Sequence, residues 1–124
     1  MRYQSKQYVR WDDLDAFGHV NNAVYLTYAQ EARFAWSGIL EMVVARAEVD
    51  FIAPIYDGDT FLDIELWVSA IGNSSFTMTY EIKMKGELVA RVKTVQVTVD
   101  MGTKKSSPIS DDQRVFLTKY LETE

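Results

Sequence analysis

Long runs of alternating apolar and polar residues constrain the fold of this chain more than any other feature. Such runs occupy most of residues 43–100, namely Val43–Ala53, Phe61–Ile71, Ser75–Lys85 and Leu88–Asp100. A period of two residues indicates β-strands with one buried face. Turn-forming residues separate the runs, and Lys85-Gly86-Glu87 predicts a tight hairpin. We therefore expect consecutive antiparallel strands, preceded by a short first strand at Tyr3–Arg10.

The last run changes phase along its length. Its apolar residues first fall on even positions and then on odd positions, as Leu88, Ala90 and Val92 and then Val95, Val97 and Val99. This change predicts a β-bulge, or a change of buried face, near Lys93-Thr94.

One segment has the composition of a helix rather than a strand. Ala23–Ser37 contains neither glycine nor proline and is rich in helix-forming residues. Asn21 or Asn22 can cap its start, and Gly38 lies where a C-terminal capping glycine belongs. Because the segment is apolar on nearly every side, we expect a buried helix.

These elements together predict an α+β domain. Strands of about eleven residues exceed the usual five or six, and long strands must twist. A curved antiparallel sheet of about five strands can bury one long helix by wrapping around it. Ser110 can cap a short last helix at Asp111–Leu121. A chain of 124 residues is the size of a single domain, residues 1–124.

Composition excludes several functional classes. The chain has no cysteine and one histidine, which argues against disulfides, a cysteine nucleophile and a metal site built from several histidines. A net charge of −5 argues against general nucleic-acid binding. We find neither a signal peptide nor an apolar run long enough to span a membrane, and expect a soluble, cytoplasmic protein.

A dense polar segment, WDDLDAFGHVNN at residues 11–22, lies directly before the predicted helix. It holds the single histidine, three aspartates and two asparagines. Free amides at a helix start favour negative charge. The segment is therefore the best candidate for a reactive site, although within it Asp12 and Asp13 are interpreted as solvated or hydrogen-bonded loop acids.

The same segment resembles the hotdog-fold acyl-CoA thioesterases, in particular the 4-hydroxybenzoyl-CoA thioesterase-like group. The signature of that group is matched by Asp15, Gly18-His19-Val20-Asn21-Asn22 and Tyr25-Leu26. The chain departs from the Glu-x-Ala-Arg element of that signature, because no residue separates Glu31 from Ala32-Arg33. The stretches ARAEVDFIAPIYDGD at 45–59 and GNSSF at 72–76 also fit, so the resemblance covers nearly the whole chain.

The resemblance implies a hotdog fold and the hydrolysis of an acyl-CoA to a free acid and CoA. Asp15 would be the nucleophile or the general base for water. The amides from Val20 to Asn22 would polarise the carbonyl group. His19 would either take part directly or order the loop, and Asn22 would cap the helix or bind substrate.

No cofactor is expected, since the CoA thioester is itself the substrate. The family's sheets typically join edge to edge, with active sites at that interface, so a homodimer or homotetramer is expected.

Other residues are candidates for binding the substrate. Phe17 and Tyr25 would line a pocket for a fatty or aromatic acyl chain or would simply fill the core. Asn22 would bind the substrate if it does not cap the helix, and Ser74 and Ser75 would contact the pantetheine arm. The basic residues of one hairpin alternate in sequence, as Lys83, Lys85, Arg91 and Lys93. They are either a solvated sheet face or, with Lys83 and Arg91 as the main candidates, a site for the phosphates of CoA. Glu31 is expected to form an ion pair or hydrogen bond that fixes the helix or a subunit contact.

Two departures from the family leave alternatives open. The GILEM segment at 38–42 is short, and Phe17 stands where plant acyl-carrier-protein thioesterases place a catalytic asparagine. A hotdog protein that binds acyl-CoA without turnover is the second hypothesis. A dehydratase ranks third, because hotdog hydratases usually place their histidine elsewhere in the fold.

Overall fold

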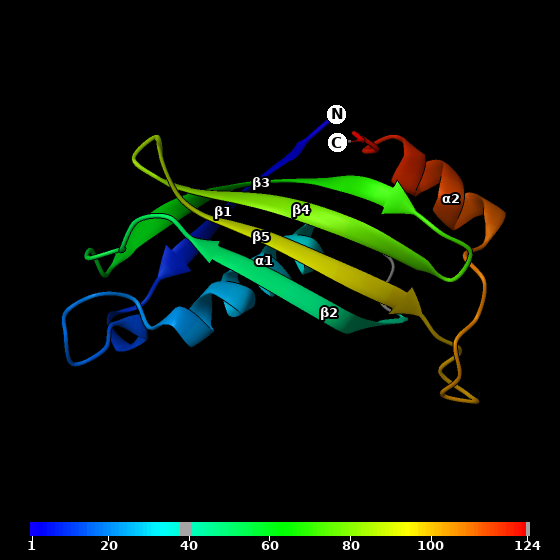
Figure 1. Ribbon diagram of the computed structural model, residues 1–124, viewed down its shortest axis with the longest axis horizontal. Helices are drawn as coiled ribbons and strands as arrows, with labels where there is room; N and C mark the ends of the chain where they lie inside the picture. The colour runs from blue at the N-terminus through cyan, green and yellow to red at the C-terminus, as the bar shows by residue number, and fades with distance from the viewer. Residues whose placement is uncertain (38–40, 124) are drawn as a thin grey trace.

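A curved, five-stranded antiparallel sheet packs over one long helix (Figure 1). The structure is a computed structural model that describes residues 1–37 and 41–123. Its elements are β1 (Tyr3–Val9), 3₁₀ turns at Trp11–Asp13 and Asn22–Val24, α1 (Tyr25–Trp36), β2 (Met42–Phe51), β3 (Thr60–Ile71), β4 (Ser75–Met84), β5 (Glu87–Thr98) and α2 (Asp111–Thr118). The strand order is β1-β3-β4-β5-β2. The predicted α+β arrangement is confirmed.

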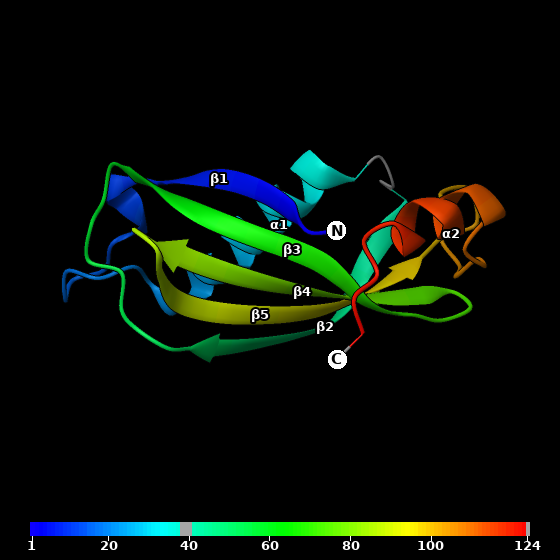
Figure 2. The ribbon, with the colours of Figure 1, turned by 90° about the horizontal axis from the view of Figure 1, so that it is seen from above.

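The core lies between α1 and the inner face of the sheet (Figure 2). The inward residues predicted for β3 and β4 are buried, for example Leu62, Ile64, Phe76 and Met78, except for Ala70, which is exposed, and Met84, which is half-buried. The helix was expected to be buried on nearly every side, and this prediction is wrong. Leu26 and Phe34 are exposed on the side of α1 that the sheet does not cover.

The predicted change of face in β5 is also wrong. Even-numbered residues stay buried from Ala90 to Thr98, so Thr94 and Gln96 point into the core. The buried face of β5 therefore continues through polar residues, which the pattern of hydrophobic residues had assigned to the opposite face. The irregularity in β5 lies instead at Val89, where the register with β4 shifts between Ile82 and Lys83.

Two further register shifts bend the neighbouring strands. One lies between Val44 and Arg46 in β2. The other lies between Val68 and Ala70 in β3, so Ala70, predicted to face inward, is exposed. Bulges of this kind bend and twist a strand locally, which helps the sheet to curve around α1.

The buried polar residues form a chain of hydrogen bonds across the core. Arg33 Nη1 donates to Tyr80 Oη at 2.9 Å, and Tyr80 Oη lies 2.8 Å from Thr94 Oγ1. Thr94 also bonds Gln96, whose Nε2 donates to the Phe76 carbonyl oxygen at 3.1 Å. Desolvation by burial raises the pKa of Tyr80. The network ties α1 to β4 and β5.

Local capping and turn chemistry behave as predicted. Lys85 and Gly86 both have positive φ, 51° and 82°, as a two-residue hairpin of type I′ requires. Ser110 Oγ accepts a hydrogen bond from the Gln113 amide at 3.1 Å and so caps α2. The helix ends earlier than expected, because Leu121 bridges to Val68 of β3. The proposed cap at Gly38 lies outside the described residues.

No helix in residues 1–37 and 41–123 combines the length and apolarity needed to cross a membrane.

Candidate active site

The polar segment forms a closed loop between β1 and α1. Leu14 and Val20 form an isolated antiparallel bridge across its base. At its tip the Asp15 amide donates to the His19 carbonyl oxygen at 2.8 Å, and the Gly18 amide donates to the Asp15 carbonyl oxygen at 3.1 Å. Gly18 has a φ of +82°, which L-residues rarely adopt. The loop is thus a tight, hydrogen-bonded turn with Asp15 and His19 on either side.

Asp15 and His19 face each other across this turn. Asp15 Oδ1 accepts a hydrogen bond from the Phe17 amide at 2.8 Å, and Oδ2 lies 3.5 Å from His19 Nδ1. His19 Nδ1 also lies 3.4 Å from the Val20 carbonyl oxygen. Because both neighbours of Nδ1 are acceptors, we assign the proton of the neutral imidazole to Nδ1. His19 Nε2 then remains available as an acceptor.

The expectation that the amides from Val20 to Asn22 are all free is wrong for two of them. The Val20 amide donates to the Ile55 carbonyl oxygen at 2.7 Å, and the Asn21 amide donates to the Asp13 carbonyl oxygen at 2.9 Å. Among the described residues, no acceptor lies within hydrogen-bond reach of the Asn22 amide. Asn22 therefore holds the one free amide of these three.

Asn21, and not Asn22, caps the helical segment. Its Oδ1 accepts a hydrogen bond from the Ala23 amide at 3.0 Å. The side chain of Asn22 is exposed and is not used in the cap. The helix start thus presents the Asn22 amide and leaves its side chain free.

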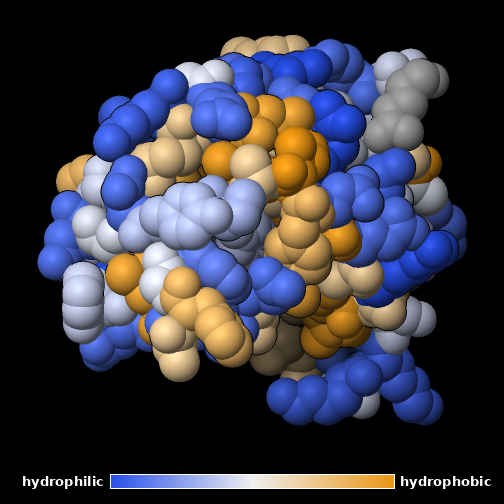
Figure 3. Space-filling view, turned by 60° about the vertical axis from the view of Figure 1, so that its left-hand side comes forward, coloured by the Kyte–Doolittle hydropathy of each residue, from blue (hydrophilic) through white to orange (hydrophobic). Residues whose placement is uncertain are grey.

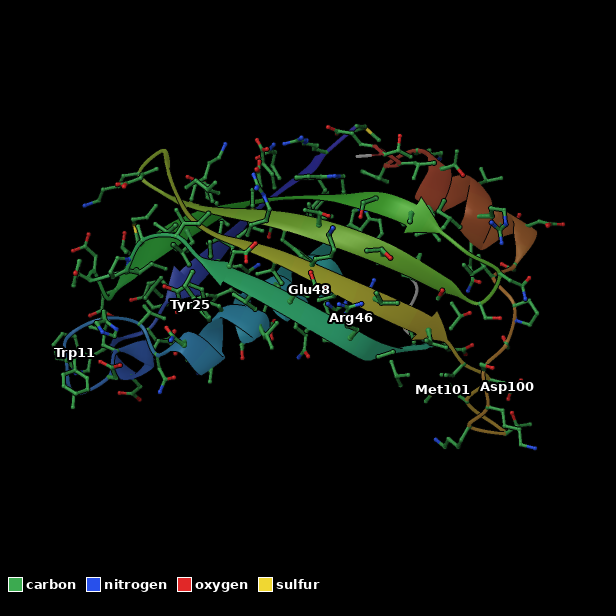
Figure 4. All side chains as sticks on the ribbon, in the orientation of Figure 1. Trp11, Tyr25, Arg46, Glu48, Asp100 and Met101 are labelled. Carbon is green, nitrogen blue, oxygen red and sulfur yellow. The ribbon has the colours of Figure 1, made fainter. Side chains whose placement is uncertain are left out.

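A small hollow of about 140 Å³ opens beside these groups. One wall is lined by His19, Val20, Asn22 and Tyr25, and the other by residues 51–54, which are the last residue of β2 and the three that follow it. Figure 4 shows Tyr25 at the start of α1, to the right of the loop that carries Trp11. Typical small-ligand pockets measure about 300–1,000 Å³. The hollow of one chain is therefore too small to enclose a large acyl group.

Aromatic side chains surround His19 at the surface. The Phe17 ring stacks on the imidazole with centroids 6.3 Å apart, and the Tyr56 ring meets it edge-on at 6.4 Å. Phe17 is 85% exposed and Tyr56 64% exposed. Viewed from this end of the molecule, hydrophobic side chains reach the surface among hydrophilic ones (Figure 3).

Asp13 is a buried carboxylate that the sequence presented only as a loop acid. It accepts a hydrogen bond from Tyr28 Oη at 2.7 Å and is paired with Arg10, whose Nη2 lies 2.9 Å away. Burial by itself raises the pKa of Asp13, but the hydrogen bonds from Tyr28 and Arg10 outweigh burial and lower it overall. Burial and the bond to Asp13 raise the pKa of Tyr28. The spacing of Arg10, Asp13 and Tyr28 in the sequence does not by itself predict that their side chains are in contact.

The structure does not bring all the candidate substrate residues to this hollow. Ser74 and Ser75 lie at the β3–β4 turn, at the far end of the sheet from the polar segment (Figure 1). Lys83 and Arg91 lie on the outer sheet face, and Arg91 Nη2 pairs with Glu81 at 2.6 Å. Lys85, at the hairpin tip, pairs with Asp57 at 3.2 Å.

Glu31 was expected to form a fixing ion pair or hydrogen bond. It is exposed, and no such partner lies within reach among the described residues. It borders a shallow groove of about 240 Å³ between β1 and α1. Within residues 1–37 and 41–123, no three acidic or histidine side chains are grouped closely enough to hold a metal ion.

The comparison with known proteins identifies the family. Residues 9–117 match the thioesterase-like superfamily. Because this match spans most of the chain, the protein belongs to that superfamily, and the class defined by fold and site is a hotdog-fold thioester hydrolase.

Individual proteins of this kind resemble the chain over most of its length. A 1,4-dihydroxy-2-naphthoyl-CoA hydrolase from Synechococcus elongatus is 28% identical over 123 residues, which cover 88% of this chain and 90% of the relative. Among solved structures, a thioesterase from Thermus thermophilus complexed with coenzyme A and Zn is 32% identical, with a TM-score of 0.85 over 94% of this chain and 92% of that one. A protein from Bacillus stearothermophilus, described as a predicted thioesterase, has a TM-score of 0.91 at 26% identity and covers 100% of this chain and 99% of its own.

Proposed function

We propose that this protein hydrolyses acyl-CoA thioesters with Asp15 as nucleophile or general base. The observation that carries the proposal is the pairing of Asp15 Oδ2 with His19 Nδ1, beside the hollow where the Asn22 amide is free. The thioesterase-like family and the CoA-bound relative agree with it.

The reaction needs little activation of the carbonyl group, because sulfur donates weakly to it. Asp15 either attacks the carbonyl carbon itself or removes a proton from an attacking water. The carbon–sulfur bond breaks, the thiolate of CoA takes up a proton, and water supplies the oxygen of the acid. If Asp15 attacks, water hydrolyses the resulting anhydride in a second step.

The Asn22 amide is the proposed donor to the developing oxyanion. It lies at the start of the helical segment, where amides point outward and the helix dipole favours negative charge. One such donor is worth about 2.7–4 kcal/mol in the transition state. His19 is proposed to orient Asp15 or the water rather than to act as a nucleophile.

A second copy of the chain is proposed to complete the site. The hollow is small and its outer wall is the end of β2, which is an edge strand. Val43 and Val44 are exposed on β2, at 53% and 45%, as is Phe51 at the hollow. An unpaired edge invites strand pairing. Antiparallel pairing of two β2 edges would bring the far end of one sheet, with Ser74 and Ser75, toward the polar segment of the other.

The acyl group is proposed to be aromatic. The exposed rings of Phe17 and Tyr56 flank His19 and offer stacking surfaces for a planar group. Several relatives are named as hydrolases of 1,4-dihydroxy-2-naphthoyl-CoA, a bicyclic aromatic thioester.

A thiol-release assay over short, long and aromatic acyl-CoAs tests the proposal. We expect turnover with aromatic substrates and, for Asp15→Asn, a loss of at least about 100-fold in kcat with the fold intact. Asp12→Asn is the matched control, since Asp12 is an exposed acid of the same loop. Full activity in Asp15→Asn would disprove the role of Asp15. Tight binding of acyl-CoA without any thiol release would favour the alternative, a non-catalytic acyl-CoA-binding protein.

A further inference from the structure

Asp13 precedes the proposed reactive residue, Asp15, by two positions, and its carboxylate is almost completely buried, which is unusual for an aspartate. Only 2% of Asp13 is exposed. Its Oδ2 accepts hydrogen bonds from the Arg10 amide at 3.0 Å and from Tyr28 Oη at 2.7 Å, and its Oδ1 accepts from Arg10 Nε and Nη2 at 3.2 and 2.9 Å. A carboxylate in this environment is satisfied as an anion and is not available for chemistry at the hollow.

Asp13 also connects the two sides of the polar loop. Its carbonyl oxygen accepts the hydrogen bond from the Asn21 amide at 2.9 Å, next to the Leu14–Val20 bridge. Asp15 follows Asp13 by two residues on one side, and Asn22 follows Asn21 directly on the other. The separation between the Asp15 carboxylate and the Asn22 amide therefore depends on this contact.

Tyr28 joins the same contact to the helix. Its ring is buried against the core from the second turn of the helical segment, and its hydroxyl reaches Asp13 across the chain. The loop that carries Asp15 is thus held against the element whose start carries the free amide. Charge-assisted bonds to a buried carboxylate are short and geometrically strict.

We infer that Asp13, through Tyr28 and Asn21, is a positioning residue that sets Asp15 relative to the Asn22 amide. The inference rests on the proposed thioesterase activity and deepens it. Asp13 touches neither substrate nor the reacting atoms. A displacement of about 1 Å can cost about 100-fold in rate even when it originates away from the chemistry.

The test compares Asp13→Asn and Tyr28→Phe with the control Asp12→Asn. We expect kcat to fall about 10-fold to 100-fold in Asp13→Asn and by a smaller factor, but more than about twofold, in Tyr28→Phe, with KM for acyl-CoA within about threefold of wild type. Assays are run well below each variant's thermal midpoint, so that loss of folded protein does not lower the rate. A purely structural role would lower the midpoint and leave kcat of the folded protein unchanged.

The inference is overturned by a folded Tyr28→Phe or Asp13→Asn protein whose kcat stays within about twofold of wild type. If Asp13→Asn does not fold, Tyr28→Phe decides, because it removes only the hydroxyl.

A readout without catalysis separates this inference from the proposed activity. In amide NMR of Tyr28→Phe, the Asn21 and Asn22 signals should shift and the Asn21 amide should exchange faster than in wild type. Unchanged signals would overturn the positioning role whether or not the wild-type protein releases thiol. Absence of thiol release by the wild type, with these shifts present, would count against the proposed function alone.

Discussion

Gly18 illustrates how one backbone angle shapes the site. Its φ of +82° closes the turn between Asp15 and His19, and a Cβ added there would have no described residue other than its chain neighbours within 4 Å. Gly86, in the β4–β5 hairpin, has the same φ and the same open surroundings. Substitution by alanine should therefore strain the backbone equally at the two glycines, but only Gly18 lies in the candidate active site.

We expect Gly18→Ala and Gly86→Ala each to lower the free energy of unfolding by about 1 kcal/mol, because an L-residue is strained at this φ. Only Gly18→Ala should also lower kcat. Urea denaturation and thiol-release assays check the pair. Equal kcat in both variants would show that the Asp15–His19 turn tolerates distortion.

Asp13 should also make the free energy of unfolding depend on pH in the acid range. Its pKa is lower in the folded protein than in the unfolded chain, so the unfolded state binds more protons near pH 4. The stability contributed by Asp13 is therefore fully present above its ordinary pKa and is lost as pH falls through the lower folded value. Denaturation curves between pH 7 and 3 should show a smaller acid loss for Asp13→Asn than for wild type. The same slope in both would contradict this assignment.

The helical segment depends on its first cap. Asn21 Oδ1 accepts the Ala23 amide, whereas the Asn22 side chain makes no cap bond. Asn21→Ala should cost about 1 kcal/mol of unfolding free energy, and Asn22→Ala a few tenths at most. Thermal unfolding of the two neighbours compares them directly. A larger loss at Asn22 would reverse the cap assignment.

The contact between α1 and the sheet depends on a buried arginine. Arg33 is 4% exposed, and its Nη1 bonds Tyr80, whereas its Nε has no hydrogen-bond partner in the part of the chain that the structure describes. Tyr80→Phe should cost about 1–3 kcal/mol, because it leaves the guanidinium still less satisfied. Arg33→Met should be neutral or stabilising, since an apolar side chain of similar length fits a core without the cost of desolvation. A loss of several kcal/mol in Arg33→Met would show that the charge itself stabilises the fold.

The ends of the chain are held together on the outer face of the sheet. Arg2 stacks on Trp67 at 3.8 Å and pairs with Glu65, Glu81 and Glu122 at 2.8–3.2 Å. The bond from Arg2 lowers the pKa of Glu122, and bonds from Gln4 and then Arg2 lower the pKa of Glu65. At the opposite side of the sheet from β1, β2 forms the other edge strand. Arg46 and Glu48, which pair with each other at 2.6 Å, lie along it (Figure 4).

For the assembled molecule, we expect a dimer that forms through β2. Val44→Lys should shift the protein to a monomer in light-scattering chromatography and lower kcat, because a charge on a pairing edge opposes strand addition. Val115→Lys is the control, since Val115 is 61% exposed and lies on α2 rather than on the β2 edge. A wild-type monomer with full activity would contradict the shared site.

Several features followed from the chain alone because neighbouring residues decide them. The hairpin at Lys85-Gly86, the Ser110 cap and the alternating core of β4 depend on backbone angles and side chains within a few positions. The Asp15 and GHVNN motif likewise located the loop, and the family match agrees with the resemblance.

Other features depended on contacts between residues far apart in the chain. Hydrophobicity suggested that β5 turns its polar half outward, yet Thr94 and Gln96 are buried because Tyr80 and Phe76 supply their hydrogen bonds. Ile55 and Asp13 occupy the amides of Val20 and Asn21 and so leave Asn22 as the free donor. Local patterns predict which elements form, whereas the folded packing decides which polar groups remain unsatisfied and can act on a substrate.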